Sequence, residues 1–252
     1  MRIAVIADIH GNRWALEAVL GDVDRRGVDV VVDLGDSVYG PLDPRGTAET
    51  LIARRIPSVR GNEDRVVLKP PAESDSQTLR YTRSCLSGEQ RRWLGDLSMT
   101  ASVLRELFCC HGTPERDDEY LLEAVSEGGV RLRTTDELAV RLAGVREAVV
   151  LCGHSHLPRL TAIPEGALIV NPGSVGLPAY TDDVPVPHAT EAGSPHARYA
   201  LIERIEAGSR VEHIALPYDW TAAARAAAVN GRPDWAEWLR TGRAPLPGRG
   251  GA

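Results

Sequence analysis

Five short polar motifs each follow an apolar run, and their side chains are of the types that bind metal ions. In chain order they are Asp8-Ile9-His10, Gly35-Asp36, Gly61-Asn62, His111-Gly112 and Gly153-His154-Ser155-His156. Carboxylate oxygens and imidazole nitrogens suit manganese, iron, zinc and related first-row ions. Each motif alone has an ordinary structural explanation, such as a turn or a hydrogen-bonded histidine. All five in order, each after an expected strand, predict a metal site.

The elements that would position these residues follow from the apolar pattern. Strand and helix patterns alternate at the start of the chain, in the order strand, helix, strand, helix, strand, over residues 3–7, 14–27, 29–34, 47–55 and 56–60. This alternation predicts parallel strands joined by right-handed crossovers. Ligands of such sheets lie beyond the carboxyl ends of the strands. Asp8, Asp36 and Asn62 all fall there, separated by 28 and 26 positions.

The remaining elements are predicted in the same way. Helices are expected over 89–97, where Ser87 and Gln90 can form a capping box, over 117–125 and 135–142, and from 219 and 233 onward. Strands are expected over 101–104 and 106–110 as a hairpin, and over 148–152, 157–163, 167–170, 199–205 and 211–216. The proline-containing segment 181–195 is expected to be a loop.

Composition limits the number of domains and the class of partner. The chain has 252 residues, 43% of them hydrophobic, and a net charge of −6. We expect one domain over 1–240 and a disordered tail over 241–252, which is rich in Gly, Pro and Arg. The acidic balance argues against a general nucleic-acid-binding surface, which needs a basic patch. Small phosphorylated substrates stay compatible, because bound metals supply local positive charge.

The same composition bears on location. The four cysteines have no CxxC spacing and are expected to be buried thiols in a reducing compartment. The chain starts directly with a strand, which leaves no room for a cleavable leader. Its apolar runs are far shorter than the roughly 20 residues of a membrane helix. We therefore expect a cytoplasmic protein with no membrane partner. A homo-oligomer stays open, because the last helices could pack on the core or on a second subunit.

The chemistry of paired metals explains why these residue types occur together. An aspartate has two oxygens and can bridge two cations, and Asp36 is the candidate for this role. Metals roughly 3.5–4 Å apart lower the pKa of a shared water, which can then attack phosphorus. Two divalent ions bring four positive charges, and Asp8 and Asp36 bring two negative ones. The remaining positive charge attracts a phosphate even within an acidic protein.

The five motifs together resemble the calcineurin-like metallophosphoesterase superfamily, over residues 1 to about 176. The resemblance implies a four-layer α/β fold, in which two mixed β-sheets form a sandwich flanked by helices. It also implies a dinuclear centre at the C-terminal ends of the strands. By resemblance one metal binds Asp8, His10, Asp36 and His156, and the other binds Asp36, Asn62, His111 and His154. The segments 35–44 and 171–178 are similar to a small prokaryotic branch named after diadenosine tetraphosphatase.

One position departs from the family pattern. Many members have Gly-Asn-His where this chain has Gly61-Asn62-Glu63, and that histidine assists the leaving group or binds phosphate. Glu63 could donate a proton only if its pKa were raised, whereas nearby metals lower it. The alternative is that Glu63 is a solvated loop acid or a partner of a ligand. The catalytic candidates are therefore Asp36, Asn62 and His111, with Glu63 in an open role.

Other residues are weaker candidates. Arg13, Arg60 and Arg116 flank the ligand motifs and could bind phosphate oxygens in a bidentate manner. His188 and His196 are expected to be solvated, and His213 to be structural. Trp235 and Trp238 are expected to form a buried helix face, with stacking on a nucleobase as the alternative. The segment 171–176 could turn near the metals.

We therefore expect a metal-dependent phosphoesterase that cleaves a phosphodiester or nucleotide-like substrate. Manganese is the first choice of metal, and iron, zinc, nickel, cobalt or magnesium are alternatives. The alternative activities are those of a phosphomonoesterase or protein phosphatase and of a dinucleoside polyphosphate hydrolase. A scaffold that retains the fold without catalysis is the alternative outside the enzymes.

Overall fold

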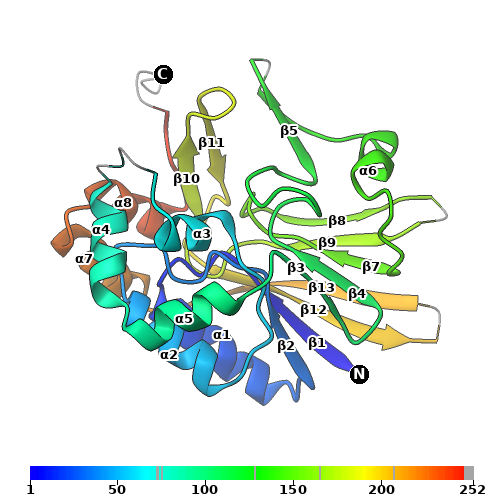
Figure 1. Ribbon diagram of the computed structural model, residues 1–252, viewed down its shortest axis with the longest axis horizontal. Coiled ribbons are helices and arrows are strands. Elements are labelled where there is room, and N and C mark those ends of the chain that lie inside the picture. Colours follow the sequence, from blue (N-terminus) through cyan, green and yellow to red (C-terminus); the bar gives the residue numbers. More distant parts are fainter. Residues whose placement is uncertain (72–73, 75, 128, 165, 207, 247–252) are drawn as a thin grey trace.

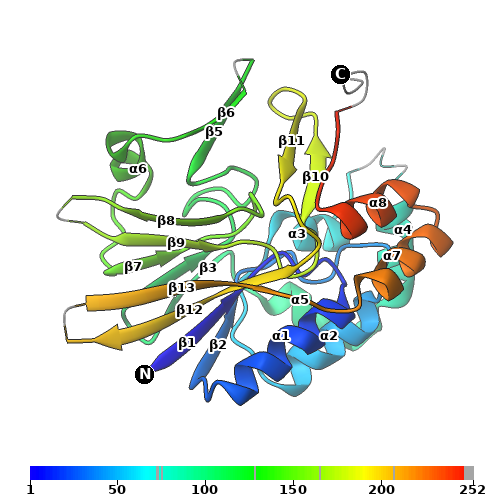
Figure 2. The ribbon, with the colours of Figure 1, turned by 180° about the vertical axis from the view of Figure 1, so that it is seen from behind.

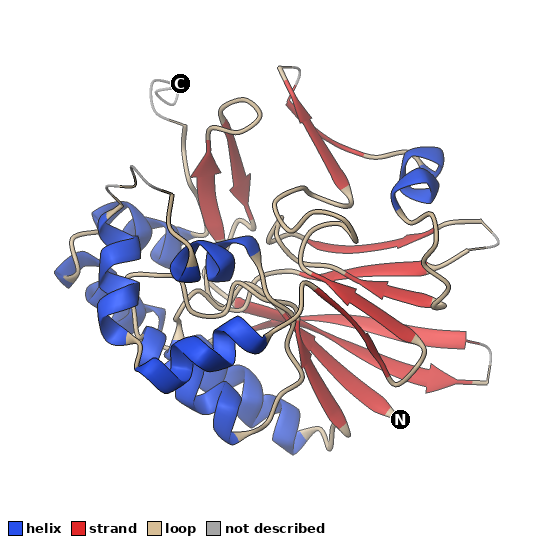
Figure 3. Ribbon diagram, in the orientation of Figure 1, coloured by secondary structure: helices blue, strands red, loops and turns tan. Residues whose placement is uncertain are grey.

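Two mixed β-sheets face each other, and helices flank them (Figures 1 and 3). This computed structural model describes residues 1–71, 74, 76–127, 129–164, 166–206 and 208–246. Figure 2 shows the same layers from behind, with α1, α2, α7 and α8 on the right and the strands of the two sheets on the left. The predicted sandwich is confirmed. Within the described parts, no helix is both long enough and apolar enough to cross a membrane.

The first sheet has the strand order β13-β12-β1-β2. Its strands are β1 (Arg2–Ile6), β2 (Val30–Asp33), β12 (Ala197–Ile205) and β13 (Gly208–Leu216). β1 and β2 are parallel, as predicted, and β12 pairs antiparallel with both β1 and β13. The predicted strand over 56–60 is wrong, because this segment meets the sheet only through one bridge between Asp33 and Ser58. Pro57 has no N–H to donate, and the Arg60 N–H donates to the carbonyl of Ser98 instead.

The second sheet has the strand order β3-β4-β7-β9-β8. Its strands are β3 (Thr100–Val103), β4 (Leu107–Cys110), β7 (Val149–Leu151), β8 (Pro158–Ala162) and β9 (Leu168–Pro172). The predicted hairpin is confirmed, because β3 and β4 pair antiparallel around Arg105. β4, β7 and β9 are parallel neighbours, so their carboxyl ends lie at one edge. That edge carries His111 and the segment 153–156.

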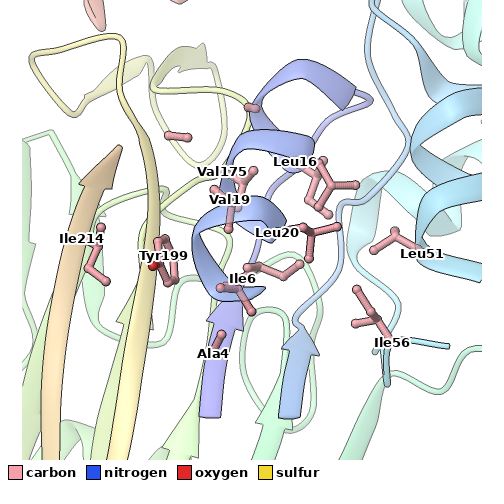
Figure 4. Packing of buried hydrophobic residues seen from close by; sticks show 14 residues of the cluster. Ala4, Ile6, Leu16, Val19, Leu20, Leu51, Ile56, Val175, Tyr199 and Ile214 are labelled. Carbon is pink, nitrogen blue, oxygen red and sulfur yellow. The ribbon is translucent and has the colours of Figure 1, made fainter. Parts of the chain in front are cut away.

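Two apolar layers hold the first sheet in place. Between the sheets, Ile3, Val5 and Val32 pack against Cys109 and Leu151, all at most 1% exposed. On the opposite face, Ala4 and Ile6 pack against α1 (Arg13–Arg25), as Figure 4 shows. β1 alternates between these two layers, which explains why its sequence is apolar throughout. The strand that leads to Asp8 is therefore buried on both faces.

The other helices complete the layers. They are α2 (Pro44–Ala53), α3 (Asn62–Leu68), α4 (Gln77–Cys85), α5 (Gly88–Asp96), α6 (Thr135–Arg141), α7 (Trp220–Val229) and α8 (Pro233–Thr241). The capping box of Ser87 and Gln90 at α5 is confirmed, with Gln90 N donating to Ser87 Oγ at 3.1 Å. α6 covers the outer face of the second sheet through Leu138 and Leu142. α7 and α8 pack on each other and reach α1 and β10.

Two small sheets lie where the sequence predicted a helix and a loop. The helix predicted over 117–125 is wrong: a loop leads into β5 (Glu123–Ser126), which pairs with β6 (Gly129–Leu132). Glu123 to Ser126 instead pair antiparallel with Gly129 to Leu132, so their backbone bonds are made across a hairpin and not within a helix. The loop predicted over 181–195 is also wrong, because β11 (His188–Glu191) pairs with β10 (Ala179–Asp182) inside it.

The C-terminal segment differs from the prediction at its start. The disordered tail was predicted from Thr241, but Thr241 is the last residue of α8. The side chain of Ala244 is fully buried, and its N–H donates to Glu191 Oε1 at 2.7 Å. Residues 247–252 lie outside the described residues.

Candidate metal centre

The seven predicted ligand residues converge at the carboxyl ends of four parallel strands. Asp8 and His10 follow β1, Asp36 follows β2, His111 follows β4, and His154 and His156 follow β7. Asn62 is the first residue of α3. Asp8 and His111 are 0% exposed and Asp36 is 2% exposed. Both sheets of the sandwich therefore contribute to one buried polar site.

The acidic and imidazole side chains form two groups. Asp8, His10 and His156 make one group, and Asp36, His111 and His154 make the other. Within each group the ligand atoms lie within 4.8 Å of one another. The groups also touch, because His111 Nε2 lies 3.2 Å from Asp36 Oδ2 and 3.9 Å from Asp8 Oδ1. This arrangement offers two adjacent positions for cations.

Backbone carbonyls orient three of the four histidine rings. The Nδ1 atoms of His10, His111 and His156 lie 2.9, 2.8 and 2.6 Å from the carbonyl oxygens of Tyr39, Leu34 and Leu177. A ring that donates its Nδ1–H presents an unprotonated Nε2, which is the form that binds a metal. The Nε2 atoms of His10 and His156 are 3.2 Å apart and face the same space.

The backbone at the ligands has an uncommon conformation. Asp8, His10, Asp36, His154 and His156 have φ between 51° and 69°. They are five of the eight non-glycine residues with positive φ among those that the structure describes. This region is disfavoured for residues with a Cβ and is concentrated at functional sites, where the surrounding structure imposes it. The left-handed turns aim successive side chains of the motifs into one site.

Two glycines let the second and third motifs approach each other. A Cβ on Gly61 would lie 2.1 Å from Asp36 Oδ1, and one on Gly35 would lie 2.5 Å from the Gly61 nitrogen. Gly35 also has φ +93°. With glycine at both positions, the N–H of Glu63 donates to Asp36 Oδ1 at 2.9 Å. The glycines are therefore required by close backbone approach and not only by turns.

The segment 171–176 supports the site, as the sequence indicated. Ser174 Oγ donates to the carbonyl of Asp8 at 2.8 Å, and Asn171 Nδ2 donates to the carbonyl of Gly153 at 2.8 Å. His213 Nε2 lies 2.9 Å from the carbonyl oxygen of Asn171, in agreement with a structural role. These bonds tie the turns that carry Asp8 and His154 to β9.

Electrostatics favour a cation at each group. Burial raises the pKa of Asp8 and lowers the pKa of His156, so charge on either is costly. Burial opposes charge on Asp36 and His111 as well, but their proximity outweighs it. The pKa of Asp36 is lowered and the pKa of His111 is raised to about 10. A divalent ion would take the place of this buried proton as the positive partner of Asp36.

Unpaired atoms show that the residues fit such ions. Asp8 Oδ2 and Asn62 Oδ1 are buried and have no hydrogen-bond partner within the described parts of the chain, whereas His111 Nε2 lies beside the Asp36 carboxylate. Buried polar atoms without partners are rare because each costs about 1–3 kcal/mol. Both unpaired atoms belong to predicted ligands; other unpaired buried atoms, such as Thr47 Oγ1 and Arg141 Nε, lie outside the ligand set. The donor set, oxygen and imidazole nitrogen, suits first-row divalent metals.

A comparison with models of known protein families identifies the family to which this chain belongs. The model of the calcineurin-like phosphoesterase superfamily domain matches residues 1–189. The chain belongs to this superfamily. It is therefore a metal-dependent phosphoesterase, a hydrolase that acts on phosphoric ester bonds, and two groups of its residues can bind metal.

Individual relatives are similar to this chain over nearly its whole length. The structure of a metallophosphoesterase from Sphaerobacter thermophilus is 25% identical, has a TM-score of 0.75, and covers 96% of this chain and 100% of its own. A hypothetical protein, PH1004, from Pyrococcus horikoshii OT3 shares the fold with a TM-score of 0.71 at 19% identity, over 97% and 99% of the two chains. An uncharacterized protein of Methanocaldococcus jannaschii, MJ0912, is 25% identical over 92% of this chain and 94% of its own.

Two cavities of this phosphoesterase meet at the candidate metal centre. The first cavity has a volume of about 240 Å³ and is lined by His10, Asp36, Tyr39, Asn62, Glu63, His154, His156, Leu177, Tyr180, Thr181, Asp182, Arg232, Trp235 and Trp238. The second cavity has a volume of about 580 Å³ and lies toward Arg116, Tyr120, Arg133 and Val184. Asn62, His154 and Asp182 line both. The metal groups therefore open to space on two sides.

The structure separates the three predicted phosphate-binding arginines. Arg116 lines the second cavity and pairs with Asp118 at 2.9 Å. Arg13 pairs with Glu17 and Asp43, and the Arg60 N–H bonds to Ser98; neither arginine is among the described residues that line the two cavities. Of the three arginines, only Arg116 lines a cavity at the candidate metal centre. Arg232, which the sequence did not single out, lines the first cavity.

Glu63 of the phosphoesterase is half-buried and lines the first cavity. Burial, together with the carboxylates of Asp36 and Asp64, raises the pKa of Glu63 to about 8. Asp64 is itself fully buried and accepts hydrogen bonds from the N–H groups of Ser37 and Gly61. Asp64 therefore holds the two ligand-bearing turns together, whereas Glu63 faces the substrate side.

A buried aromatic network supports the last ligand motif. Tyr180 Oη donates to the carbonyl of His154 at 3.0 Å, and Tyr120 Oη bonds to both Tyr180 Oη and His188 Nε2. The prediction of a solvated His188 is wrong, because this side chain lies on β11 and is 4% exposed. Sequence patterns missed the network because Tyr120 lies 60 positions before Tyr180 and because the segment that carries His188 was predicted as a loop.

Proposed function

We propose that this phosphoesterase hydrolyses phosphodiester or nucleotide-like substrates with a two-metal centre. One metal would bind Asp8, His10, Asp36 and His156, and the other would bind Asp36, Asn62, His111 and His154. The observation that carries the proposal is the pair of buried ligand groups with unpaired atoms, open to a cavity on each side. Manganese is the proposed metal, because the oxygen and imidazole donors suit it.

The two cavities favour a diester over a monoester. A phosphodiester has two substituents on one phosphorus, and the site has space on both sides of the shared residues Asn62 and His154. Charge favours the same choice: Asp182 lines both cavities and would repel the second negative charge of a monoester. A diester carries only one negative charge.

The protein residues have separable roles in this proposal. When bound, the metals supply Lewis acidity and a water of lowered pKa. Asp36 holds the site together, since its Oδ1 accepts the Glu63 N–H and its Oδ2 lies beside His111. Asn62 and His154 face both cavities and would position the phosphoryl group between them. Glu63 would hold a proton near the leaving group as long as its pKa stays raised.

The testing experiment is hydrolysis of bis-p-nitrophenyl phosphate by chelator-stripped protein, with and without added Mn²⁺. We expect activity only with metal, and a kcat/KM at least about 10-fold above that for p-nitrophenyl phosphate. Dinucleoside polyphosphates and other metals form the second panel. A clear preference for the monoester would overturn the diester assignment. Absence of hydrolysis across all substrates and metals would favour the scaffold alternative.

Removing His111 should empty one metal position preferentially. His111 belongs to the second ligand group and touches Asp8 only at 3.9 Å. We expect His111→Ala to lower the metal content from about two to about one per chain, measured by mass spectrometry after dialysis. The control is His196→Ala, which removes a half-buried histidine that contacts Ser194 and Trp220 outside both ligand groups and should leave the metal content unchanged. Unchanged stoichiometry in His111→Ala would contradict the ligand assignment.

Replacing Glu63 tests the source of the proton for the leaving group. Glu63→His restores the residue that many family members have, and an imidazole donates protons well near neutral pH. We expect kcat/KM for alkyl diesters to rise about 10-fold, with little change for nitrophenyl diesters, whose leaving group needs no proton. Glu63→Gln is the matched control that removes the proton donor. The same leaving-group dependence in all three proteins would exclude position 63 from acid catalysis.

A further inference from the structure

The C-terminal helix α8 forms an aromatic wall that begins at a candidate metal ligand. The ring of Trp235 meets the ring of His10 edge-on, with centroids 5.8 Å apart. Trp238 lies one turn further along α8, 6.2 Å from Trp235 and tilted by 37°. Both rings line the first cavity. The wall therefore extends outward from the position where a phosphate would bind.

The inner part of this wall is held rigidly. Trp235 is 4% exposed, and a Cβ on Gly40 would lie 3.3 Å from its ring. The guanidinium of Arg232 lies 5.4 Å from the centroid of the same ring and bonds to Asp234 and Thr78. Trp235 is thus packed from several sides. Its role is to support the cavity and to fix α8 against His10.

Trp238 differs from Trp235 in its exposure. Its side chain is only half-buried: it packs against the apolar cluster that contains Leu177, and it lines the first cavity, as Tyr39 and Leu177 also do. The volume of about 240 Å³ lies below the roughly 300–1,000 Å³ of pockets for drug-sized ligands, so it suits a single ring system. Planar, aromatic and half-exposed surfaces of this kind bind the faces of nucleobases in other proteins.

We propose that the first cavity is a subsite for a planar aromatic group, such as a nucleobase, which stacks on Trp238 while its phosphate lies at the metal centre. This rests on the proposed function, since it requires the phosphate to bind at the two ligand groups. Tyr39 and Leu177 also line this cavity, and the ring of Trp235 contacts both the ring of Trp238 and the ring of His10. Substrates with an aromatic or nucleoside substituent are thereby preferred over purely alkyl ones.

The test compares two probes that share a phosphate and a ribose. AMP and ribose 5-phosphate are titrated into manganese-loaded protein, and Kd is measured by calorimetry and by tryptophan fluorescence. We expect AMP to bind more tightly, because base stacking on one aromatic side chain contributes about 5- to 150-fold in Kd. Trp238→Leu should remove most of this difference, weakening AMP and leaving ribose 5-phosphate unchanged. Trp238→Phe should retain most of it.

The matched control is Trp220→Leu. Trp220 is also half-buried but lies on α7 beside His196 and Tyr218, outside the described lining of the cavity. It should leave both Kd values unchanged, and melting curves check that each variant is folded. Equal binding of AMP and ribose 5-phosphate by the wild type, or equal loss in the Trp238 and Trp220 variants, would overturn the subsite while leaving the phosphoesterase proposal intact. Failure to bind either probe would overturn the subsite, whereas hydrolysis of bis-p-nitrophenyl phosphate by the same manganese-loaded protein decides the phosphoesterase proposal separately.

Discussion

Asp36→Asn should abolish phosphoester hydrolysis while the protein stays folded. Asp36 lies between the two ligand groups, with Oδ2 3.2 Å from His111 and 4.0 Å from His10. Asparagine has nearly the same shape and can still accept the Glu63 N–H, so the fold is retained. It lacks the negative charge that would hold two cations. Because losing one transition-state-stabilising group costs about 10²–10³ in kcat, we expect a loss of at least about 10³-fold.

The measurement is kcat on bis-p-nitrophenyl phosphate together with metal content and a thermal melt. Asp22→Asn is the matched control, because Asp22 is also a buried acid but bonds Tyr199 and Arg26 far from the site. The Asp22→Asn variant should have a lower Tm, and its folded molecules should keep the wild-type kcat. An Asp36→Asn protein with more than about a tenth of wild-type turnover would exclude Asp36 from a bridging role.

The positions of the ligand motifs could be predicted because they depend on short-range sequence. β1 and β2 are apolar runs buried on both faces, and a parallel pair brings its carboxyl ends together whatever the rest of the chain does. Asp8 and Asp36 follow these runs directly. The sheet order of the second half was not predictable, since β12 returns to pair with β1 over nearly 200 residues. That pairing depends on long-range packing that local periodicity does not contain.

The substrate-facing residues could not be predicted for a related reason. Trp238 and Arg232 lie far along the chain from Glu63, and only the packing of α8 brings them into one cavity. The pattern of Trp235 and Trp238, three residues apart, is that of a buried helix face, and for Trp235 this interpretation is correct. Trp238 has the same local signal but is only half-buried, and both rings line the first cavity. Sequence periodicity cannot distinguish a fully buried ring from a half-buried one that lines a cavity.

The errors over 117–125 and 181–195 have one physical cause. In both segments, a short strand forms because it pairs with a neighbouring strand. Its own residues do not favour a strand strongly enough to be recognised. Within 181–195, His188 and Thr190 point inward at 4% exposure each, while the surrounding prolines indicate a loop. The pairing partner, β10, carries Tyr180, which reaches the carbonyl of His154. The two mispredicted segments therefore surround the centre whose ligands were identified.

Removing the metal should lower the Tm of this protein measurably. Adding metal back should restore the Tm by an amount that depends on pH. Stripped protein keeps buried unpaired atoms at Asp8 and Asn62, and the folded chain brings together ligands that lie far apart in the unfolded one. At Mn²⁺ 100-fold above Kd, each site adds about 2.7 kcal/mol to the free energy of unfolding. For a chain of this size, that raises Tm by roughly 5–11 °C per site. Differential scanning calorimetry with and without chelator measures the shift.

The sign of this pH dependence follows from the protons that must leave the ligand side chains before a metal can bind. In the metal-free protein, the nearby Asp36 carboxylate overcomes the effect of burial and raises the pKa of His111 to about 10. Burial also raises the pKa of Asp8. A metal requires neutral imidazole and ionised carboxylate, so its binding releases these protons and its affinity increases as the pH rises. The Tm gain at fixed Mn²⁺ should therefore be larger at pH 8 than at pH 6. An equal gain at both pH values, or an equal gain in Asp36→Asn, would place the bound metal elsewhere on the protein.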